Sequence, residues 1–265
     1  MTKREKIRLD ALLVERGLAP TRNVAVGCIL AGRVFSGERR LDKPGAPLAR
    51  DTPLSLRELP RYVSRGGVKL EGALLALHVD VSGKTWLDIG ASTGGFTDCL
   101  LQHGARRVYA VDVGRGQLAE KLRQDERVVN RENENARHLV RTSFPEPIDG
   151  VVVDASFIGL GKLLPAIAAV LLPGGWLLAM IKPQFEAGRE LARVHRGVIT
   201  DPALRARIID DAKVEVAAHG FAMLGSCDSS LAGPKGNVEH FVFAARQPAG
   251  ASGTVGASDP AGAHG

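Results

Sequence analysis

Residues 85–101 read TWLDIGASTGGFTDCLL: an apolar run that ends in an acid, a glycine-containing turn and a second apolar segment. The first run has the length of a buried strand, and the apolar residues after the turn recur at helical spacing. Similar strand and helix patterns alternate from residue 68 to EHFVFAA at residues 239–245. This alternation predicts an α/β fold with a mostly parallel sheet covered on both faces, in which ligands bind at the carboxyl ends of the strands.

Composition narrows the class of protein. The chain has 265 residues, enough for two domains, and 45% of them are hydrophobic. Cys28, Cys99 and Cys227 stand far apart with no CxxC pair, so we expect neither a disulfide framework nor a metal site. The first residues, MTKREKIRLD, are charged and lack the apolar segment of a secretory signal, and we therefore expect a cytoplasmic protein.

Charge is distributed unevenly along the chain. Residues 1–65 hold 14 Lys and Arg against 7 Asp and Glu, whereas residues 66–265 hold 21 against 22. A basic segment joined to a near-neutral one suggests a nucleic-acid-binding module attached to a second domain. A solvated charged surface explains the bulk charge equally well.

One apolar stretch, residues 155–181, raises a membrane-active protein as an alternative. It contains Lys162, Pro165 and a Pro-Gly-Gly break at 173–175, so it has no uninterrupted apolar span of about 20 residues. A buried helix, a turn and a buried strand fit this stretch better, and we expect no stable membrane partner.

The basic segment has its own helical pattern. Leu9, Leu12 and Leu13 follow helical spacing before a stop at Gly17, and Thr21 is placed to cap a second helix that ends at Gly32. Short strand-like pieces follow. This order of elements resembles the S4 RNA-binding domain, a small α+β fold. The resemblance implies contacts with RNA phosphates, for which the candidates are Arg8, Arg22, Arg33, Arg39, Arg40 and Arg65.

The turn after the first strand carries glycines spaced as GxxxGG and lacks the dinucleotide-binding pattern GxGxxG. Asp88 ends the strand, where a carboxylate would repel an anionic pyrophosphate. S-adenosylmethionine instead offers an ammonium and a sulfonium. Asp112 ends the next strand, where it can accept hydrogen bonds from ribose hydroxyls.

DIGASTGG followed by VDVG therefore resembles a Rossmann-like class I methyltransferase with S-adenosylmethionine as its cofactor. A nicotinamide site is the less favoured alternative. In such enzymes a residue after the third strand contacts the adenine, and Asn135 lies at that place, although Glu134 departs from the pattern. The resemblance implies these cofactor-binding residues: Asp88, Gly90, Ala91, Ser92, Gly94, Gly95, Asp112 and Asn135.

Four charged residues stand where core packing does not explain them. Lys69 lies one step off an apolar helical stripe and is expected to point toward a rim. Asp154 and Lys182 each end an apolar strand, and Glu239 begins a late one. Singly, each is more typical of a solvated strand end. The shared sheet edge predicts that they converge on one crevice with Asp88 and Asp112.

The order Lys69, Asp154, Lys182, Glu239 resembles the catalytic tetrad of FtsJ-type ribose 2'-O-methyltransferases. Together with DASF, KPQFE, GPKGNVEH and the S4-like start, residues 6–244 resemble the TlyA (haemolysin A) family. This resemblance implies methylation of cytidine ribose in the RNA of small or large ribosomal subunits. Two other functions stay open: a membrane-active haemolysin-like protein, and an RNA-binding assembly factor with a regulatory S-adenosylmethionine site.

The chemistry of a ribose hydroxyl suits these residue types. The hydroxyl is a poor nucleophile and must lose its proton as it attacks the methyl carbon. A lysine accepts such a proton only when its pKa is lowered, and a second cation nearby has that effect. Lys182 is the candidate base and Lys69 its neighbouring cation, while Asp154 and Glu239 hold the ammonium groups.

Base methylation fits less well. DASF lacks the Asn/Asp-Pro-Pro-aromatic pattern of exocyclic amino methylation, and no cysteine nucleophile follows either strand. Phe157 and Phe185 could stack on a flipped nucleotide or belong to the core. The expected organisation is an S4-like domain at 1–59, a linker at 60–67, a class I methyltransferase domain at 68–247 and a disordered tail at 248–265.

Overall fold

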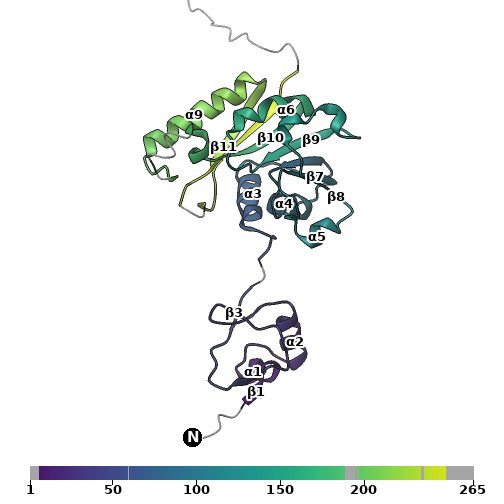
Figure 1. Cartoon of the computed structure of the whole chain (residues 1–265), viewed down its shortest axis with the longest axis vertical. Helices are drawn as coiled ribbons and strands as arrows, with labels where there is room; N and C mark the ends of the chain where they lie inside the picture. Colours follow the sequence, from purple (N-terminus) through teal and green to yellow (C-terminus); the bar gives the residue numbers. More distant parts are fainter. Residues whose placement is uncertain (1–5, 59, 189–194, 196, 234–235, 249–265) are drawn as a thin grey trace, which may run out of the picture. The chain divides into compact units, whose positions relative to one another are not determined.

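The chain divides into two compact units, Met1–Arg61 and Tyr62–Gly265. The structure is a computed structural model that describes residues 6–58, 60–188, 195, 197–233 and 236–248. The tail that we expect to be disordered thus lies outside the described residues, except for Pro248. Figure 1 shows the elements of both units.

The N-terminal unit contains the two helices that the apolar spacing predicts, α1 (Leu9–Glu15) and α2 (Arg22–Leu30). The Thr21 hydroxyl accepts a hydrogen bond from the Val24 backbone N–H and so caps α2. Two small antiparallel sheets accompany the helices: β1 (Lys6–Arg8) with β4 (Pro47–Ala49), and β2 (Val34–Ser36) with β3 (Arg39–Arg40) and β5 (Ser55–Leu56). Apolar side chains of both helices form one small core with Val34.

The C-terminal unit is built on a seven-stranded sheet with the order β11-β12-β10-β9-β6-β7-β8. The five strands from β10 to β8 run parallel, and β12 is antiparallel to both of its neighbours. The strands are β6 (Thr85–Ile89), β7 (Arg107–Asp112), β8 (Val128–Glu132), β9 (Ile148–Val153), β10 (Leu171–Ile181), β11 (Phe221–Asp228) and β12 (His240–Arg246). The mostly parallel sheet confirms the predicted fold class.

Helices cover both faces of this sheet, as Figure 1 shows. Alternate residues of β6 point to opposite faces: Leu87 packs in the core that α6 and α9 cover, and Trp86 packs in the core under α3 and α4. The helical elements are α3 (Arg65–Ala76), α4 (Gly95–Gln102), α5 (Glu120–Arg123), η1 (Ala136–His138), η2 (Arg141–Ser143), η3 (Leu160–Lys162), α6 (Leu164–Val170), α7 (Pro183–Glu186) and α9 (Pro202–Ala218).

The apolar stretch 155–181 forms η3, α6 and β10. The turn expected at 173–175 is an irregularity inside β10, where pairing with β9 shifts register between Leu171 and Trp176. Pro173 lies in this irregular part, where a residue without an N–H is tolerated. Within the described ranges, no helix combines the length and the apolar character needed to cross a membrane.

Candidate active site

The glycine turn joins β6 to α4 at the carboxyl edge of the sheet. Gly90 has a φ of +84°, and a Cβ there would lie 2.9 Å from the carbonyl oxygen of Asp154. Only glycine therefore allows the turn to lie this close to the end of β9. A cavity of about 370 Å³ opens beside the turn, lined by the predicted residues Gly90, Ala91, Ser92, Gly95, Lys69 and Asp154 together with Ser64, Arg65, Gly66, Thr93 and Phe96.

Three carboxylates surround this turn. Asp88 is fully buried at the end of β6; its Oδ2 accepts a hydrogen bond from the Thr97 hydroxyl at 2.7 Å, and its Oδ1 has no hydrogen-bond partner among the described residues. Burial raises the pKa of Asp88 to about 7, and the charges of Asp154 and Asp112 add to the increase. An incompletely satisfied acidic site suits a cationic ligand and disfavours a pyrophosphate.

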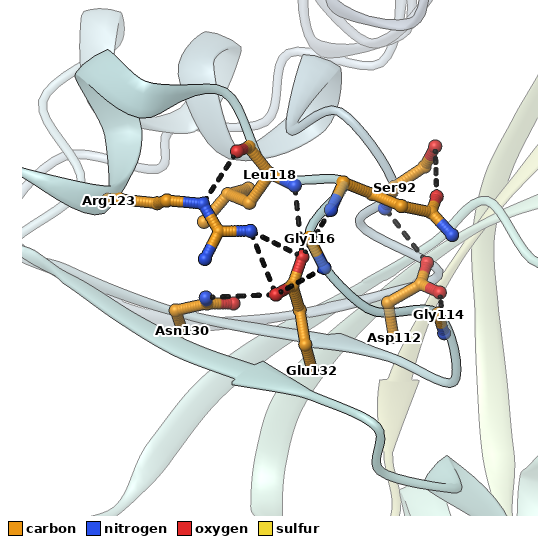
Figure 2. Close-up of polar contacts among 9 residues, drawn as sticks. Ser92, Asp112, Gly114, Gly116, Leu118, Arg123, Asn130 and Glu132 are labelled. Atoms are coloured by element: carbon orange, nitrogen blue, oxygen red, sulfur yellow. Dashed lines mark hydrogen bonds and ion pairs between the residues drawn. The ribbon is translucent and has the colours of Figure 1, made fainter.

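Asp112 ends β7 and faces the turn. Its Oδ2 accepts a hydrogen bond from the Ser92 backbone N–H at 2.8 Å, and its Oδ1 accepts one from the Gly114 N–H at 2.7 Å (Figure 2). Because a carboxylate has about four acceptor positions, Asp112 can also accept hydrogen bonds from ligand hydroxyls. The predicted role of Asp112 toward a ribose is thus compatible with its contacts.

Asn135 caps η1, where its Oδ1 accepts hydrogen bonds from the Arg137 backbone N–H and Nε at 3.1 and 3.2 Å. It is absent from the described lining of the cavity beside the turn. Glu134 contacts the guanidinium of Arg131 at 2.5 Å. The contact of Asn135 with an adenine stays a prediction.

The four residues of the predicted tetrad form two Lys–carboxylate pairs. Lys69 Nζ, on α3, lies 2.9 Å from Glu239 Oε2, and these side chains are 9% and 4% exposed. Lys182 Nζ, after β10, lies 2.5 Å from Asp154 Oδ1 and donates to the Ser156 hydroxyl at 2.9 Å. Lys69, which we expected to point toward a rim, is instead buried in an ion pair.

The two pairs influence each other electrostatically. Burial raises the pKa of Asp154, the Lys182 ammonium opposes this rise, and the charges of Lys69 and Glu239 act on the same carboxyl with opposite signs. All four residues therefore belong to one charged cluster at the carboxyl edge of the sheet. The structure brings together the residues that the strand ends and α3 were expected to supply.

A second and larger cavity, of about 860 Å³, lies on the other side of this cluster and is bordered by Lys182 and Glu239. Phe157 and Phe185 also line it, with their ring centroids 5.2 Å apart. The Phe157 side chain is 90% exposed, so it does not belong to the core. The tetrad thus lies between a cavity beside the glycine turn and a cavity with an exposed aromatic residue.

The predicted RNA-binding arginines lie in both units. In the N-terminal unit, Arg8 and Arg22 contact the buried carboxylate of Asp10 at 2.8 and 3.1 Å, while their own side chains are 54% and 59% exposed. Arg33 Nε donates to a backbone carbonyl, and Arg39 and Arg40 are exposed on β3. Arg65 belongs to the C-terminal unit, where it donates to the Ala232 carbonyl and lines the smaller cavity.

Sequence reasoning missed three side chains that contact predicted site residues or the neighbouring loop. Thr97 donates to Asp88, Ser156 accepts from Lys182, and Glu132 accepts from backbone N–H groups of residues 116–118. Glu132 follows the polar pair Asn130-Arg131, so it lacks the signal of an acid directly after an apolar run that marks Asp88 and Asp112. The other two are hydroxyls whose partners depend on the tertiary structure.

The fold and this site define a Rossmann-like class I methyltransferase unit. The FtsJ-like methyltransferase model matches residues 62–246, and the S4 domain model matches residues 7–52. The chain belongs to the FtsJ-like methyltransferase family and carries an S4 domain at its N-terminus.

Several known proteins are similar to this chain over most of their length. YqxC of Bacillus subtilis, named as a candidate rRNA methyltransferase, is 49% identical over 89% of this chain and 84% of its own. The 16S/23S rRNA (cytidine-2'-O)-methyltransferase TlyA of Mycobacterium tuberculosis is 42% identical over 90% of this chain and 89% of its own. A solved structure of a candidate hemolysin from Streptococcus thermophilus is 40% identical, covers 92% of this chain and 90% of its own, and has a TM-score of 0.69.

Proposed function

We propose that the protein transfers the methyl group of S-adenosylmethionine to the ribose 2'-hydroxyl of cytidine in ribosomal RNA. The observation that carries this proposal is the position of two Lys–carboxylate pairs between two cavities. One cavity is lined by the glycine turn and Asp154, and the other by an exposed aromatic side chain. The relatives named as rRNA methyltransferases support the RNA substrate.

The acids around the glycine turn fit the methyl donor. S-adenosylmethionine supplies an electrophilic methyl group on a sulfonium and carries an ammonium at its other end. Asp154, paired with Lys182, lines this cavity, Asp88 lies buried at the end of β6, and Asp112 can accept hydrogen bonds from ribose hydroxyls. Calorimetry should therefore detect S-adenosylmethionine binding that Asp112→Ala weakens, whereas binding of NAD alone would contradict the assignment.

The four residues of the tetrad act on the ribose 2'-hydroxyl that receives the methyl group. As the 2'-oxygen gains the methyl group it loses its proton, and Lys182 borders the cavity in which the nucleotide would lie. We assign the removal of this proton to Lys182 in its neutral amine form, because an ammonium has no lone pair to accept it, and the orientation of the hydroxyl to Lys69. Asp154 and Glu239 hold the two lysine side chains in place through the observed pairs. Phe157 and Phe185 offer a surface on which a base can stack.

The N-terminal unit supplies the RNA contacts in this proposal. In this proposal residues 1–59 form the RNA-binding domain and residues 68–247 the catalytic domain. Residues 60–67 connect them, and the first turn of α3, which begins at Arg65, belongs to this connection. The substrate is RNA within ribosomal subunits, which places the reaction in the cytoplasm. Among the described residues, no group of His, Cys, Asp or Glu side chains is arranged to hold a metal ion.

The test is single-turnover methylation of purified ribosomal subunits, with the modified ribose located by its resistance to alkaline cleavage. Lys182→Ala should abolish detectable turnover, because general-base assistance contributes about 10²- to 10⁴-fold and misalignment adds to the loss. Lys182→Arg should also fail, because a guanidinium does not release its proton to become a base.

A matched control is Lys213→Ala, which removes a lysine from a Lys–carboxylate pair with Asp210 on the surface of α9. Its rate should equal that of the wild type. If Lys182→Arg keeps most of the wild-type rate, the lysine acts only through its positive charge, and another group accepts the proton. A methyl group found on a base would refute the assignment of the tetrad.

A further inference from the structure

The side chain of Glu132, on β8, holds the loop of residues 113–118 beside the glycine turn (Figure 2). Glu132, the last residue of β8, accepts hydrogen bonds from three consecutive backbone N–H groups. Its Oε1 accepts from Gln117 at 2.7 Å and from Leu118 at 3.0 Å, and its Oε2 accepts from Gly116 at 3.0 Å. Three convergent amides form a nest for an anion, and here a carboxylate of the protein itself occupies that nest.

Arg123, the last residue of α5, completes this clamp. Its Nη2 lies 2.8 Å from each carboxylate oxygen of Glu132, and its Nε donates to the Leu118 carbonyl at 2.8 Å. The Glu132 side chain is only 12% exposed. The hydrogen bonds from the Leu118 amide, Arg123 and the neighbouring amides together hold the pKa of Glu132 well below its usual range. The carboxylate therefore stays charged and fixes the loop and α5 to β8.

The clamped segment contacts the glycine turn directly. Leu118 and Leu122 pack so closely against Gly94 that a Cβ on Gly94 would lie 2.8 Å and 2.2 Å from their Cδ1 atoms. The Ser92 hydroxyl donates to Gln117 Oε1 at 3.1 Å. Displacement of the loop would thus remove contacts from two residues of the turn.

The same loop also supports Asp112. The Gly114 amide donates to one carboxylate oxygen of Asp112, and the Gly114 carbonyl accepts a hydrogen bond from the Asn133 N–H at 2.9 Å, next to Glu132. Asp112, assigned to the ribose of the donor, and the glycine turn are therefore both attached to the segment that Glu132 holds.

We propose that Glu132 is a positioning residue for the methyl-donor site, which it keeps in its binding geometry before the ligand arrives. This inference rests on the proposed function, because the ligand concerned is S-adenosylmethionine. Without the clamp, ligand binding must order the loop, and the lost conformational entropy weakens affinity. Glu132 itself is not among the residues lining either cavity, so the transfer step at saturating donor should be unaffected.

The experiment compares the full-length wild type with Glu132→Gln and Glu132→Ala. Glutamine keeps the shape but cannot accept from all three amides and the guanidinium. We expect the Kd and the KM for S-adenosylmethionine to rise roughly tenfold or more, within the range of typical coupling effects, while kcat stays within about twofold. Amide hydrogen exchange at residues 116–118 should become faster in both variants.

Asp125→Asn is the matched control, because Asp125 precedes β8, at the end opposite Glu132, and its side-chain hydrogen bonds within the described structure go to Arg127, at 2.7 Å for the ion pair. This variant should bind S-adenosylmethionine as the wild type does. If Glu132→Ala does not fold, Glu132→Gln decides the question. Unchanged affinity in a folded Glu132→Gln variant, or a loss of kcat with unchanged KM, would overturn the inference. Failure of the wild type to bind S-adenosylmethionine would instead overturn the proposed function.

Discussion

Asp88 allows a quantitative test of how burial shapes the donor site. Burial raises the pKa of its carboxyl from 3.8 to about 7. Between these pH values the folded chain keeps a proton that the unfolded chain has released. The contribution of Asp88 to the free energy of unfolding should therefore fall by about 1.4 kcal/mol per pH unit from about pH 4 to about pH 7, or roughly 4 kcal/mol in total, and stay level above pH 7.

The substitution Asp88→Asn removes this titration. The amide has a constant cost, because its NH₂ group would be buried beside Thr97 without a clear acceptor, at about 1–3 kcal/mol. That cost does not depend on pH. The wild type should therefore be the more stable protein near pH 4, and its advantage over Asp88→Asn should shrink by roughly 4 kcal/mol by pH 8.

Urea unfolding followed by tryptophan fluorescence measures this difference. Both tryptophans of the chain, Trp86 and Trp176, lie in the C-terminal unit, so the signal reports on the unit that contains Asp88. Buffers from pH 4.5 to pH 8 cover most of the interval. Stability curves of wild type and variant that run parallel across this range would refute the reasoning, because they would show that the buried carboxyl titrates at its ordinary pKa.

Three further predictions concern the ion pairs and the two units. Glu239→Ala should lower the free energy of unfolding by about 3–5 kcal/mol because it leaves the Lys69 ammonium buried alone, whereas the double variant Lys69→Met with Glu239→Leu should recover stability but not methylation. Hydrogen bonding from Arg8, the main cause, holds the pKa of Asp10 at about 2 against an ordinary 3.8, so the N-terminal unit should lose stability from about pH 4 down to about pH 2. Circular dichroism of Asp10→Asn should show this dependence removed. Isolated residues 62–265 should bind S-adenosylmethionine but bind ribosomal subunits poorly, and full-length binding should weaken steeply with salt.

The strand ends were the most informative part of the sequence. An apolar run followed by an acid or a lysine marks a buried strand and the edge at which its last residue emerges, and this pattern located Asp88, Asp112, Asp154 and Lys182 at one edge of the sheet. The parallel order follows from the alternation of strands and helices. Local patterns therefore predicted both the fold class and the edge of the sheet at which these four side chains lie.

Local sequence patterns could not predict which groups pair across the fold through ion pairs and hydrogen bonds. Helical spacing showed that Lys69 leaves the apolar stripe, but its burial depends on Glu239, which lies 170 residues away in sequence. Glu132 ends β8 as Asp112 ends β7, yet its partners are backbone amides of a loop whose conformation the sequence does not reveal. Long-range pairs of this kind are defined only once the sheet has formed.

The pairing of the lysines also explains how so much charge can be held at a semi-enclosed site. An isolated ammonium or carboxylate in a partly buried position is strongly unfavourable, whereas a close pair with further hydrogen bonds is tolerated. Lys69 with Glu239 and Lys182 with Asp154 are each neutral as pairs, and Asp88 is close to half protonated near pH 7. Asp112 adds a negative charge beside the glycine turn, and that charge is opposite in sign to a sulfonium and an ammonium. The cluster can therefore be stable without a ligand and still attract a cationic methyl donor to the cavity beside the turn.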